Sequence, residues 1–349
     1  MARKLASVQE VTSIEPIEGA DRLVCAQILG WKVVVNKGDF KPGDKCVYFE
    51  VDSFLPDDDP RFEFLRARSF RSNEFMGRGM RIRTMKLRGQ LSQGLVLPLS
   101  QFPEVGANAE VGTDVTQLLR VRKWEMPEQD TGAGVSLGSF HAGIPKTDET
   151  RVQSEPGLIG ELTAAGEYYI STKMDGTSCT MYFEHGVFGV CGHNFEYKDT
   201  PTCAMWNYAH EHGLPEKFAA FAHDSGRDLA IQGEFCGPGI QKNPLVLMRN
   251  ELFCFTLIDL ATHERMPLDD LLATCDALGL QTVPVEERGP AFPYRTEDEL
   301  IERAKGTYKS GRRKEGIVIR PVVPVYSATL GGPLSMKVIN NDYLLKQKD

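Results

Sequence analysis

A short run near the middle of the chain, Lys173-Met174-Asp175-Gly176-Thr177-Ser178, places an amine beside a carboxylate and a glycine turn, just after an apolar strand. An amine in such a setting can attack the α-phosphate of a nucleotide. The ordinary pKa of a lysine is near 10.4, so only about one molecule in a thousand is neutral at pH 7, a handicap of roughly 4 kcal/mol. Burial, a second cation or a bound divalent metal would lower the pKa of Lys173 and make it a competent nucleophile.

The same run also suits a surface hairpin in which Asp-Gly makes the tight turn, so by itself it is weak evidence. Its meaning depends on four segments that follow in order. These are Gly233-Glu234, Leu252 to Ile258, Lys314-Glu315-Gly316 before an apolar triplet, and Ser335-Met336-Lys337-Val338.

Together with Lys173, the order and spacing of these segments resemble the motifs of the covalent nucleotidyltransferase superfamily, which contains polynucleotide ligases and messenger-RNA capping enzymes. The resemblance spans residues 146–337, and the runs 145–153 and 335–340 look the most family-specific. Its details are most similar to RNA ligases, in particular the family-five group with an N-terminal OB module. The resemblance implies an ATP-dependent RNA ligase, acting in RNA repair, that seals 5′-phosphate and 3′-hydroxyl ends through a lysyl-AMP intermediate and an adenylated RNA 5′ end.

The resemblance assigns a role to each candidate residue. Lys173 would attack ATP and expel pyrophosphate. Asp175, Glu234 and Glu315 would surround Mg²⁺ or Mn²⁺, partly through water, because such ions prefer oxygen ligands and keep several waters. Glu234 would alternatively hold the ribose. Lys337 would contact the α-phosphate and help to lower the pKa of Lys173 through like-charge proximity, so the catalytic set is Lys173, Asp175, Glu315 and Lys337.

The nucleotide-binding set adds Gly176, His193 and Phe255 to Lys173, Glu234 and Lys337. Phe253 and Phe255 are two residues apart on an expected strand and so share a face. Phe255 fits the family pattern better as the ring that stacks on adenine, and a plain core role for both rings is the alternative.

Two positions depart from the family pattern. His193 stands where related ligases tend to have arginine, so that its protonation near neutral pH would make a nucleotide contact pH-sensitive; the alternative is a loop residue. Ser335 stands where many ligases have the first lysine of Lys-x-Lys. Its hydroxyl can donate to a phosphate but adds no charge.

The net charge of −8 argues against a nucleic-acid partner, but the local distribution of charge differs. Between residues 66 and 88 eight cationic side chains face one acid, Glu74, with Phe70 and Phe75 among them: Arg66, Arg68, Arg71, Arg78, Arg81, Arg83, Lys86 and Arg88. A second basic run, 305–314, precedes Glu315. We expect the first run to contact RNA, although a solvated charged face is the commoner fate of such runs.

The fold class expected is α+β, with three regions. Residues 1–115 would form a small OB-like β-barrel that binds nucleic acid, because short β-branched runs (Val8 to Ile14, Leu23 to Leu29, Trp31 to Val35, Cys46 to Val51) alternate with turn signals. Strand content alone fits an SH3-like barrel nearly as well. Residues 116–144 read as a linker, and residues 145–349 as a ligase-type adenylyltransferase domain of antiparallel sheets with flanking helices, unrelated to ATP-grasp.

In this second domain strands are predicted at Tyr168 to Ser171, Thr177 to Phe183 and Val187 to Cys191, with a turn at 184–186. Helices are predicted from a capping box at Thr296 and over Pro267 to Leu278.

The remaining features exclude several classes of protein. No apolar stretch approaches the ~20 residues that span a bilayer, and no secretory leader is evident, so we expect a cytoplasmic or nucleoplasmic monomer whose partner is RNA or an RNA-containing nicked duplex. The eight cysteines lack a Cys-x-x-Cys pair and are expected to be reduced and buried. Only twelve residues follow Lys337, which disfavours DNA ligases and capping enzymes with a trailing OB domain. The alternatives are a non-catalytic RNA-binding protein that retains the ligase fold, and a capping-type enzyme.

Overall fold

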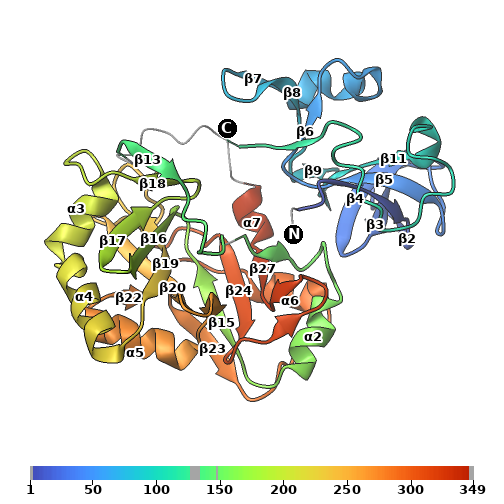
Figure 1. Ribbon diagram of the computed structural model, residues 1–349. Coiled ribbons are helices and arrows are strands. Elements are labelled where there is room, and N and C mark those ends of the chain that lie inside the picture. Colours follow the sequence, from blue (N-terminus) through green and yellow to red (C-terminus); the bar gives the residue numbers. More distant parts are fainter. Residues whose placement is uncertain (1–2, 126–133, 147, 346–349) are drawn as a thin grey trace. The chain divides into compact units, whose positions relative to one another are not determined.

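The structure is a computed structural model that describes residues 3–125, 134–146 and 148–345 (Figure 1). Its chain divides into two compact units. The first is Met1–Gln129 with Gln153–Pro156, and the second is Asp130–Val152 with Gly157–Lys346. Both units mix strands with short helices, so the class is α+β as expected.

The N-terminal unit consists of antiparallel sheets. One sheet has the order β1 (Ala6–Glu10), β5 (Lys45–Phe49), β11 (Leu95–Pro98), and another the order β2 (Ser13–Pro16), β3 (Leu23–Ile28), β4 (Trp31–Asn36). A third has the order β12 (Arg122–Lys123), β6 (Ser53–Pro56), β8 (Gly77–Arg81), β7 (Phe70–Asn73), and β9 (Met85–Leu87) pairs with β10 (Gln90–Ser92). The short helical segments are η1 (Pro60–Leu65), α1 (Arg66–Ser69) and η2 (Leu99–Gln101).

The single strand expected over Val8 to Ile14 is wrong, because the chain changes sheets there. The N–H of Val11 donates to the carbonyl oxygen of Asp44 (3.0 Å), whereas that of Thr12 donates to Gln27 (2.9 Å). One run of apolar residues therefore serves two sheets, which is how a small barrel closes around its core. Trp31, Tyr48 and Phe49 are fully buried there.

The C-terminal unit has two larger sheets. The eight-stranded sheet runs β13 (Ser136–Ser139), β18 (Phe195–Tyr197), β17 (Val187–Cys191), β16 (Thr177–Glu184), β19 (Leu229–Cys236), β20 (Glu251–Asp259), β21 (Glu264–Arg265), with β22 (Gln281–Thr282) parallel to β20. The five-stranded sheet runs β14 (Thr150–Arg151), β27 (Met336–Ile339), β24 (Gly316–Pro321), β15 (Tyr168–Lys173), β23 (Val285–Gly289). A hairpin of β25 (Tyr326–Ser327) and β26 (Gly332–Pro333) lies apart from both.

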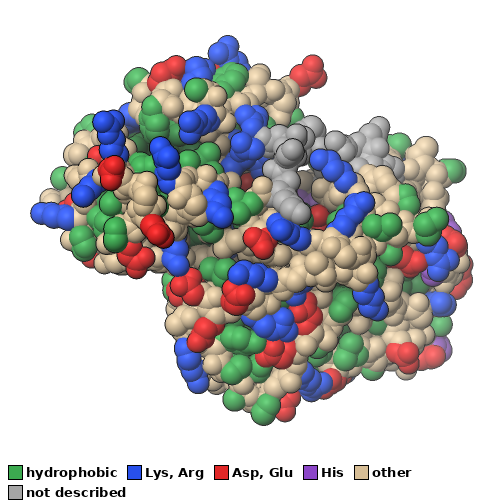
Figure 2. Space-filling view, turned by 180° about the vertical axis from the view of Figure 1, so that it is seen from behind, with side chains coloured by type: hydrophobic (Ala, Val, Ile, Leu, Met, Phe, Trp, Pro, Cys, Tyr) green, Lys and Arg blue, Asp and Glu red, His purple; other side chains and the backbone are tan. Residues whose placement is uncertain are grey.

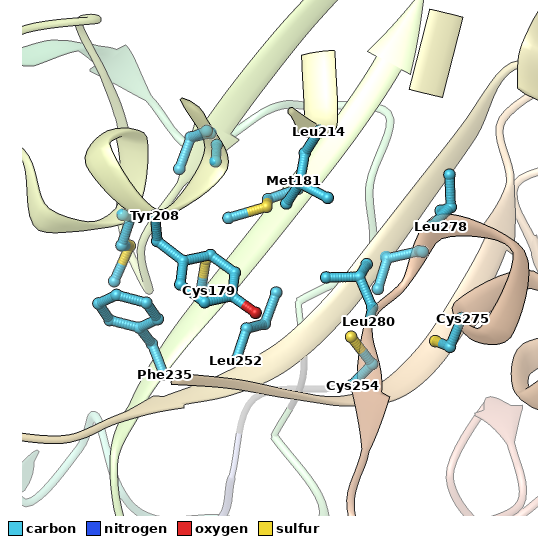
Figure 3. Packing of buried hydrophobic residues seen from close by; sticks show 14 of the residues in the cluster. Cys179, Met181, Tyr208, Leu214, Phe235, Leu252, Cys254, Cys275, Leu278 and Leu280 are labelled. Carbon is cyan, nitrogen blue, oxygen red and sulfur yellow. The ribbon is translucent and has the colours of Figure 1, made fainter. Parts of the chain in front are cut away.

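Helices cover these sheets and bury their apolar faces. Helices α3 (Ala204–Glu211), α4 (Leu214–Ser225) and α5 (Leu268–Leu278) pack on the larger sheet around Met181, Leu214 and Leu252 (Figure 3). Helices α2 (Leu158–Ala164) and α6 (Glu297–Arg303) pack on the five-stranded sheet, and α7 (Asn341–Leu344) follows β27. All eight cysteines are free and buried, which confirms the expectation. None of the described helices is long and apolar enough to cross a membrane.

Two local sequence signals in this unit, a hairpin turn and a helix capping box, are confirmed by the structure. The predicted turn at 184–186 has positive φ at His185 (49°) and Gly186 (83°), as a two-residue hairpin requires. The capping box of α6 is present, with Thr296 and Glu299 hydrogen-bonded to each other reciprocally.

The segment 116–144, expected as a linker, contains a strand of each unit. Strand β12 pairs with β6 of the N-terminal unit, and β13 pairs with β18 of the C-terminal unit.

Candidate active site

A cavity of about 220 Å³ opens between strands of the two sheets of the C-terminal unit. Its lining includes five of the predicted site residues: Lys173, His193, Glu234, Phe255 and Lys337. The other three predicted residues lie next to the lining. Gly176 is hydrogen-bonded to Glu234, Glu315 is hydrogen-bonded to Lys173, and the charge of Asp175 acts on Lys173. The sequence-predicted set therefore gathers at one place.

Lys173 ends β15 and points at the carboxylate of Glu315, with Nζ and Oε2 2.8 Å apart. The register explains this approach, because Lys173 pairs with Gly316 across the β15–β24 ladder and Glu315 is the residue just before. Tyr308, which sequence reasoning missed, joins the two segments. Its hydroxyl donates to the carbonyl oxygen of Lys173 (2.9 Å) and accepts from the N–H of Glu315 (3.0 Å).

Gly176 turns the chain into β16 against the end of β19. Its N–H donates to Oε1 of Glu234 at 3.0 Å. A Cβ atom at this position would lie 2.5 Å from the carbonyl oxygen of Phe235 and 2.6 Å from the sulfur of Cys236. The glycine is therefore needed for close approach of two backbones rather than for a left-handed conformation.

Two carboxylates of the site, Asp175 and Glu234, have pKa values above the ordinary range. Burial raises the pKa of Asp175 to about 6, reinforced by Glu315 and opposed by the hydroxyl of Tyr343, which donates to Oδ2 at 2.7 Å. Burial likewise raises the pKa of Glu234 to about 7, with Lys173 opposing and Glu315 adding to the rise. An additional positive charge at this cluster of acids would stabilise their ionised forms and lower their pKa values.

The expected lowering of the pKa of Lys173 is not found in the ligand-free protein. Burial acts to lower this pKa, but Glu315, Glu234 and Asp175 outweigh burial and raise it. The like-charge effect of the two lysines falls instead on Lys337, whose pKa is lowered by burial and by Lys173. Neutral Lys173 therefore requires that other cations engage its carboxylate partners.

Lys337 is tied to the run 145–153 that the sequence singled out. Its Nζ donates to Oδ1 of Asp148 at 3.0 Å, across the parallel pairing of β14 with β27. Ser335 does not face a phosphate position, because its hydroxyl donates to the buried carboxylate of Glu149. Burial opposes, but Arg320 and Arg265 hold the pKa of Glu149 down at about 2. Ser335 thus completes a buried ion cluster and leaves Lys337 as the cation of this strand.

Phe255 reaches the cavity through a bulge in β20. Gln232 pairs with Thr256 and Gly233 with Cys254, so Phe255 is the extra residue between them. A bulge re-aims a side chain, and such bulges are common beside active sites. Phe255 lines the cavity, and the guanidinium of Arg320 lies 5.6 Å from its ring centre. Both Phe253 and Phe255 pack on the apolar cluster around Met174, but only Phe255 is among the residues that line this cavity.

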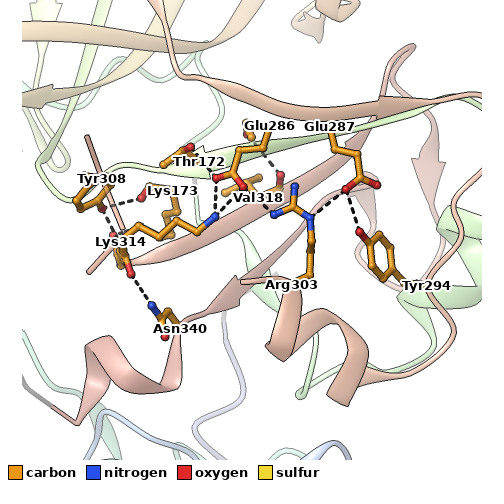
Figure 4. Close-up of polar contacts among 12 residues, drawn as sticks. Thr172, Lys173, Glu286, Glu287, Tyr294, Arg303, Tyr308, Lys314, Val318 and Asn340 are labelled. Atoms are coloured by element: carbon orange, nitrogen blue, oxygen red, sulfur yellow. Dashed lines mark hydrogen bonds and ion pairs between the residues drawn. The ribbon is translucent and has the colours of Figure 1, made fainter. Parts of the chain in front are cut away.

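A second bulge places Glu286 behind Lys173 (Figure 4). Glu286 lies between Ile170–Glu287 and Ser171–Val285 pairs, so its carboxylate turns toward the neighbouring strands. It accepts from the hydroxyl of Thr172 (2.7 Å), from Nζ of Lys314 (2.6 Å) and from Arg303 (2.8 Å). Thr172 and Lys314 directly precede Lys173 and Glu315, so one carboxylate fixes both strands from behind. No motif in the sequence pointed to Glu286.

Comparison with known proteins agrees with this geometry. A profile of OB-fold domains matches residues 5–99, and a profile of RNA ligases matches residues 166–339. A variant of the Naegleria gruberi RNA ligase with AMP and Mn is 34% identical with a TM-score of 0.89, over 99% of this chain and 100% of that one. The chain belongs to the RNA ligase family. The first profile decides between OB and SH3-like barrels in favour of the OB-fold.

Two further structures of the same enzyme resemble this RNA ligase closely. A glutamate-to-alanine variant with ATP and Mn is 35% identical with a TM-score of 0.89, covering 99% of this chain and 100% of that one. The complex with PPi is 34% identical with a TM-score of 0.86, covering 98% of each chain. Among curated protein sequences, none matches this RNA ligase.

Proposed function

We propose that this RNA ligase joins 5′-phosphate and 3′-hydroxyl RNA ends through a covalent lysyl-AMP on Lys173, using ATP, and that it acts in RNA repair. The observation that carries the proposal is the setting of one amine. Nζ of Lys173 lies in a cavity with Glu315 at 2.8 Å and with Glu234, Phe255 and Lys337 in the lining. Complexes of the Naegleria gruberi enzyme with AMP or ATP, and with PPi, support a nucleotidyl transfer of this kind.

In the proposed first step Nζ of Lys173 attacks the α-phosphorus of ATP, a phosphorus–nitrogen bond forms and pyrophosphate leaves. Oε2 of Glu315 is placed to accept the proton of the amine, and Lys337 to neutralise charge on the α-phosphate. An RNA 5′-phosphate then displaces the lysine to give adenylated RNA, and a 3′-hydroxyl finally displaces AMP. Alignment and charge neutralisation are the main contributions of the protein to such transfers.

The acids of the site fit a divalent metal, which we propose to be Mg²⁺ or Mn²⁺. Asp175, Glu234 and Glu315 offer only oxygen ligands, and the raised pKa values of Asp175 and Glu234 support a site that a positive charge would stabilise. Within the described part of the chain, no three acidic, histidine or cysteine side chains form a ready cluster for a bare ion. The arrangement therefore suits a hydrated ion held partly through water, and its charge would assist the departure of pyrophosphate.

We propose that the N-terminal unit binds RNA or an RNA-containing nicked duplex. We also propose that the protein acts as a monomer. Lysine and arginine side chains gather with hydrophobic ones over this unit (Figure 2). Arg68, Lys86 and Arg88 are exposed in this unit, and so are the rings of Phe64 (63%) and Phe75 (60%). Cationic and aromatic side chains together suit phosphates and bases.

Part of this positive charge is matched by acids just outside the counted run. Arg66 pairs with Glu63 (2.7 Å) and Arg78 with Asp57 (3.0 Å). We therefore expect the exposed members, rather than all eight, to carry the affinity for RNA.

The two alternatives explain the site less well. RNA binding without catalysis does not require the contact between Lys173 and Glu315. It also does not require Glu286 to hold the residues that precede them. A capping-type enzyme would use GTP, and the structures that resemble this chain hold ATP or AMP.

Mass spectrometry of the protein after incubation with ATP and Mg²⁺ tests the proposal. We expect an AMP adduct on Lys173, none in Lys173→Ala, and an unchanged adduct in Lys198→Ala, which alters an exposed lysine of the same unit. GTP should give no adduct, which separates a ligase from a capping-type enzyme. Absence of any adduct with metal present would end the ligase and capping proposals together. Nicked and single-stranded RNA, DNA and hybrid substrates then define the end that is sealed.

A further inference from the structure

The loop between β19 and β20 has an unusual backbone. Four residues other than glycine have positive φ: Gln241 (44°), Lys242 (60°), Asn243 (47°) and Val246 (58°). This conformation is a true outlier for a β-branched residue such as Val246. Such strain costs of order 1–3 kcal/mol per residue and persists only where the surroundings enforce it, most often at functional sites.

Two sets of hydrogen bonds enforce the loop. The side chain of Asn243 brackets Leu247, donating to its carbonyl oxygen (2.8 Å) and accepting from its N–H (3.0 Å). From the segment before β24, Arg312 donates to the carbonyl oxygens of Lys242 (3.2 Å) and Asn243 (3.1 Å), and the hydroxyl of Ser310 donates to that of Pro244 (2.8 Å). The two segments therefore form one rigid projection.

Side chains along the loop alternate between the inside and the solvent. Leu245 and Leu247 pack on the cluster that contains Met174 and Tyr308. Met174 is the neighbour of Lys173, and the hydroxyl of Tyr308 is hydrogen-bonded to the backbone of Lys173 and Glu315. The inner side of the loop therefore packs on residues that directly support Lys173 and Glu315. Val246 and Met248 face outward with 53% and 93% of their surface exposed.

The surroundings of these two apolar side chains are strongly positive. The segments 237–250 and 305–313 contain six cationic residues and no aspartate or glutamate, in a chain with a net charge of −8: Lys242, Arg249, Lys305, Lys309, Arg312 and Arg313. Acids outside the segments engage two of them: Arg249 pairs with Glu251 and also lies in the field of Glu211, and Lys305 pairs with Glu302 and lies in the field of Asp342. Lys242, Lys309 and Arg312 are exposed.

We propose that Val246 and Met248 form an apolar wedge that contacts the terminal nucleotides of the RNA end presented to adenylated Lys173, while Lys242 and Lys309 hold its phosphates. The proposal rests on the proposed ligase function and deepens it. Exposed apolar side chains on a rigid loop can insert against base steps, and cations beside them bind the backbone of a polyanion. A protein partner would be expected to meet a mixed rim of charges, whereas these two segments are cationic throughout.

Sealing measured separately from adenylation tests the wedge. In Met248→Ala and Lys309→Ala we expect self-adenylation with ATP to stay within twofold of the parent protein. Sealing of a nicked RNA that is already adenylated at its 5′ end should fall at least tenfold in Met248→Ala, and Met248→Leu should restore most of it. Lys309→Ala should lower the slope of log affinity for RNA against log salt by about one.

Val187→Ala and Arg227→Ala are the matched controls. Val187 is 59% exposed, and Arg227 is exposed just before β19 begins at Leu229, at the opposite end of that strand from the loop. Both controls should seal like the parent protein.

Two results would overturn the wedge while leaving the ligase proposal intact. The first is normal sealing by Met248→Ala. The second is an equal loss of adenylation and sealing, which would mean that the loop only supports Lys173. Failure of the parent protein to form an adenylate would instead refute the proposed function itself.

Discussion

The raised pKa of Glu234, a partly buried carboxylate, predicts that the protein becomes more stable when this candidate site residue is neutralised. Its pKa lies at about 7 because burial penalises the charge and Glu315 and Asp175 repel it, against the attraction of Lys173 and the N–H of Gly176. An ordinary glutamate has a pKa of about 4.5. Folding therefore becomes less favourable as the pH rises from about 4.5 through about 7, because the native state holds the proton more tightly than the unfolded chain does.

The magnitude follows from the same two values. A pKa that moves from about 4.5 to about 7 corresponds to about 3 kcal/mol of native-state free energy at pH 8. Glu234→Gln keeps an acceptor for the N–H of Gly176 and removes the charge. Because water in the cavity screens part of the repulsion, we expect a gain of roughly 2 kcal/mol at pH 8 and close to none at pH 5.

Thermal unfolding of the metal-free protein at several pH values measures this effect. For a domain of this size 2 kcal/mol corresponds to about 4–8 °C in Tm. Glu234→Gln should therefore melt higher than the parent at pH 8 and equally at pH 5, while Glu211→Gln, an exposed acid on α3, should show no such dependence. Added Mn²⁺ should narrow the difference at pH 8, because the ion relieves the repulsion in the parent protein only. A difference in Tm that is the same at both pH values would refute the assignment of the cost to ionised Glu234.

Three further predictions concern neighbouring parts of the site. Gly176→Ala should destabilise the protein by about 2–3 kcal/mol in urea unfolding, because its Cβ would meet the backbone of β19, while Gly160→Ala has open space around it and should cost little. Phe255→Ala should raise the KM for ATP in self-adenylation about tenfold or more through lost stacking, and Phe255→Tyr should retain most of the affinity; an unchanged KM would place adenine elsewhere. Glu286→Gln should slow single-turnover adenylation by tenfold or more and leave binding of labelled RNA unchanged, because Lys314 loses its partner and Glu315 its fixed position; loss of both activities together would indicate unfolding instead.

Linear spacing was enough to find candidate residues that the fold then brings together, because Lys173 and Glu315 stand at the ends of strands whose pattern is local. Lys173 ends an apolar run, Glu315 precedes another, and strand pairing then brings the two together. The same holds for Lys337 on β27, which pairs with β24. Residues whose position follows from the ladder are predictable once the order of the strands is known from a resemblance.

Residues at irregularities were not predictable from the local pattern alone, and the choice of Phe255 rested on the family resemblance. Phe255 and Glu286 are both the extra residue of a bulge, and a bulge reverses the expected face of a side chain without any local signature. Alternation could therefore not choose between Phe253 and Phe255, and it could not point to Glu286 at all. The left-handed turn at Val246 is hidden for the same reason, since that conformation is imposed by Arg312 and Asn243 rather than preferred by valine.

The charge state of Lys173 shows the limit of reasoning from residue types alone. Two lysines and three acids were expected at one place, and the sign of the result depends on distances that only the fold supplies. Nζ of Lys173 lies 2.8 Å from Glu315, whereas Lys337 is held by Asp148 at 3.0 Å, so the acids prevail at Lys173 and its pKa rises. We therefore expect Lys173 to be an ammonium ion in the ligand-free protein. If Lys173 is the nucleophile, as we propose, a ligand that brings positive charge to Glu315, Glu234 and Asp175 would release the amine, which would couple metal binding to the reaction with ATP.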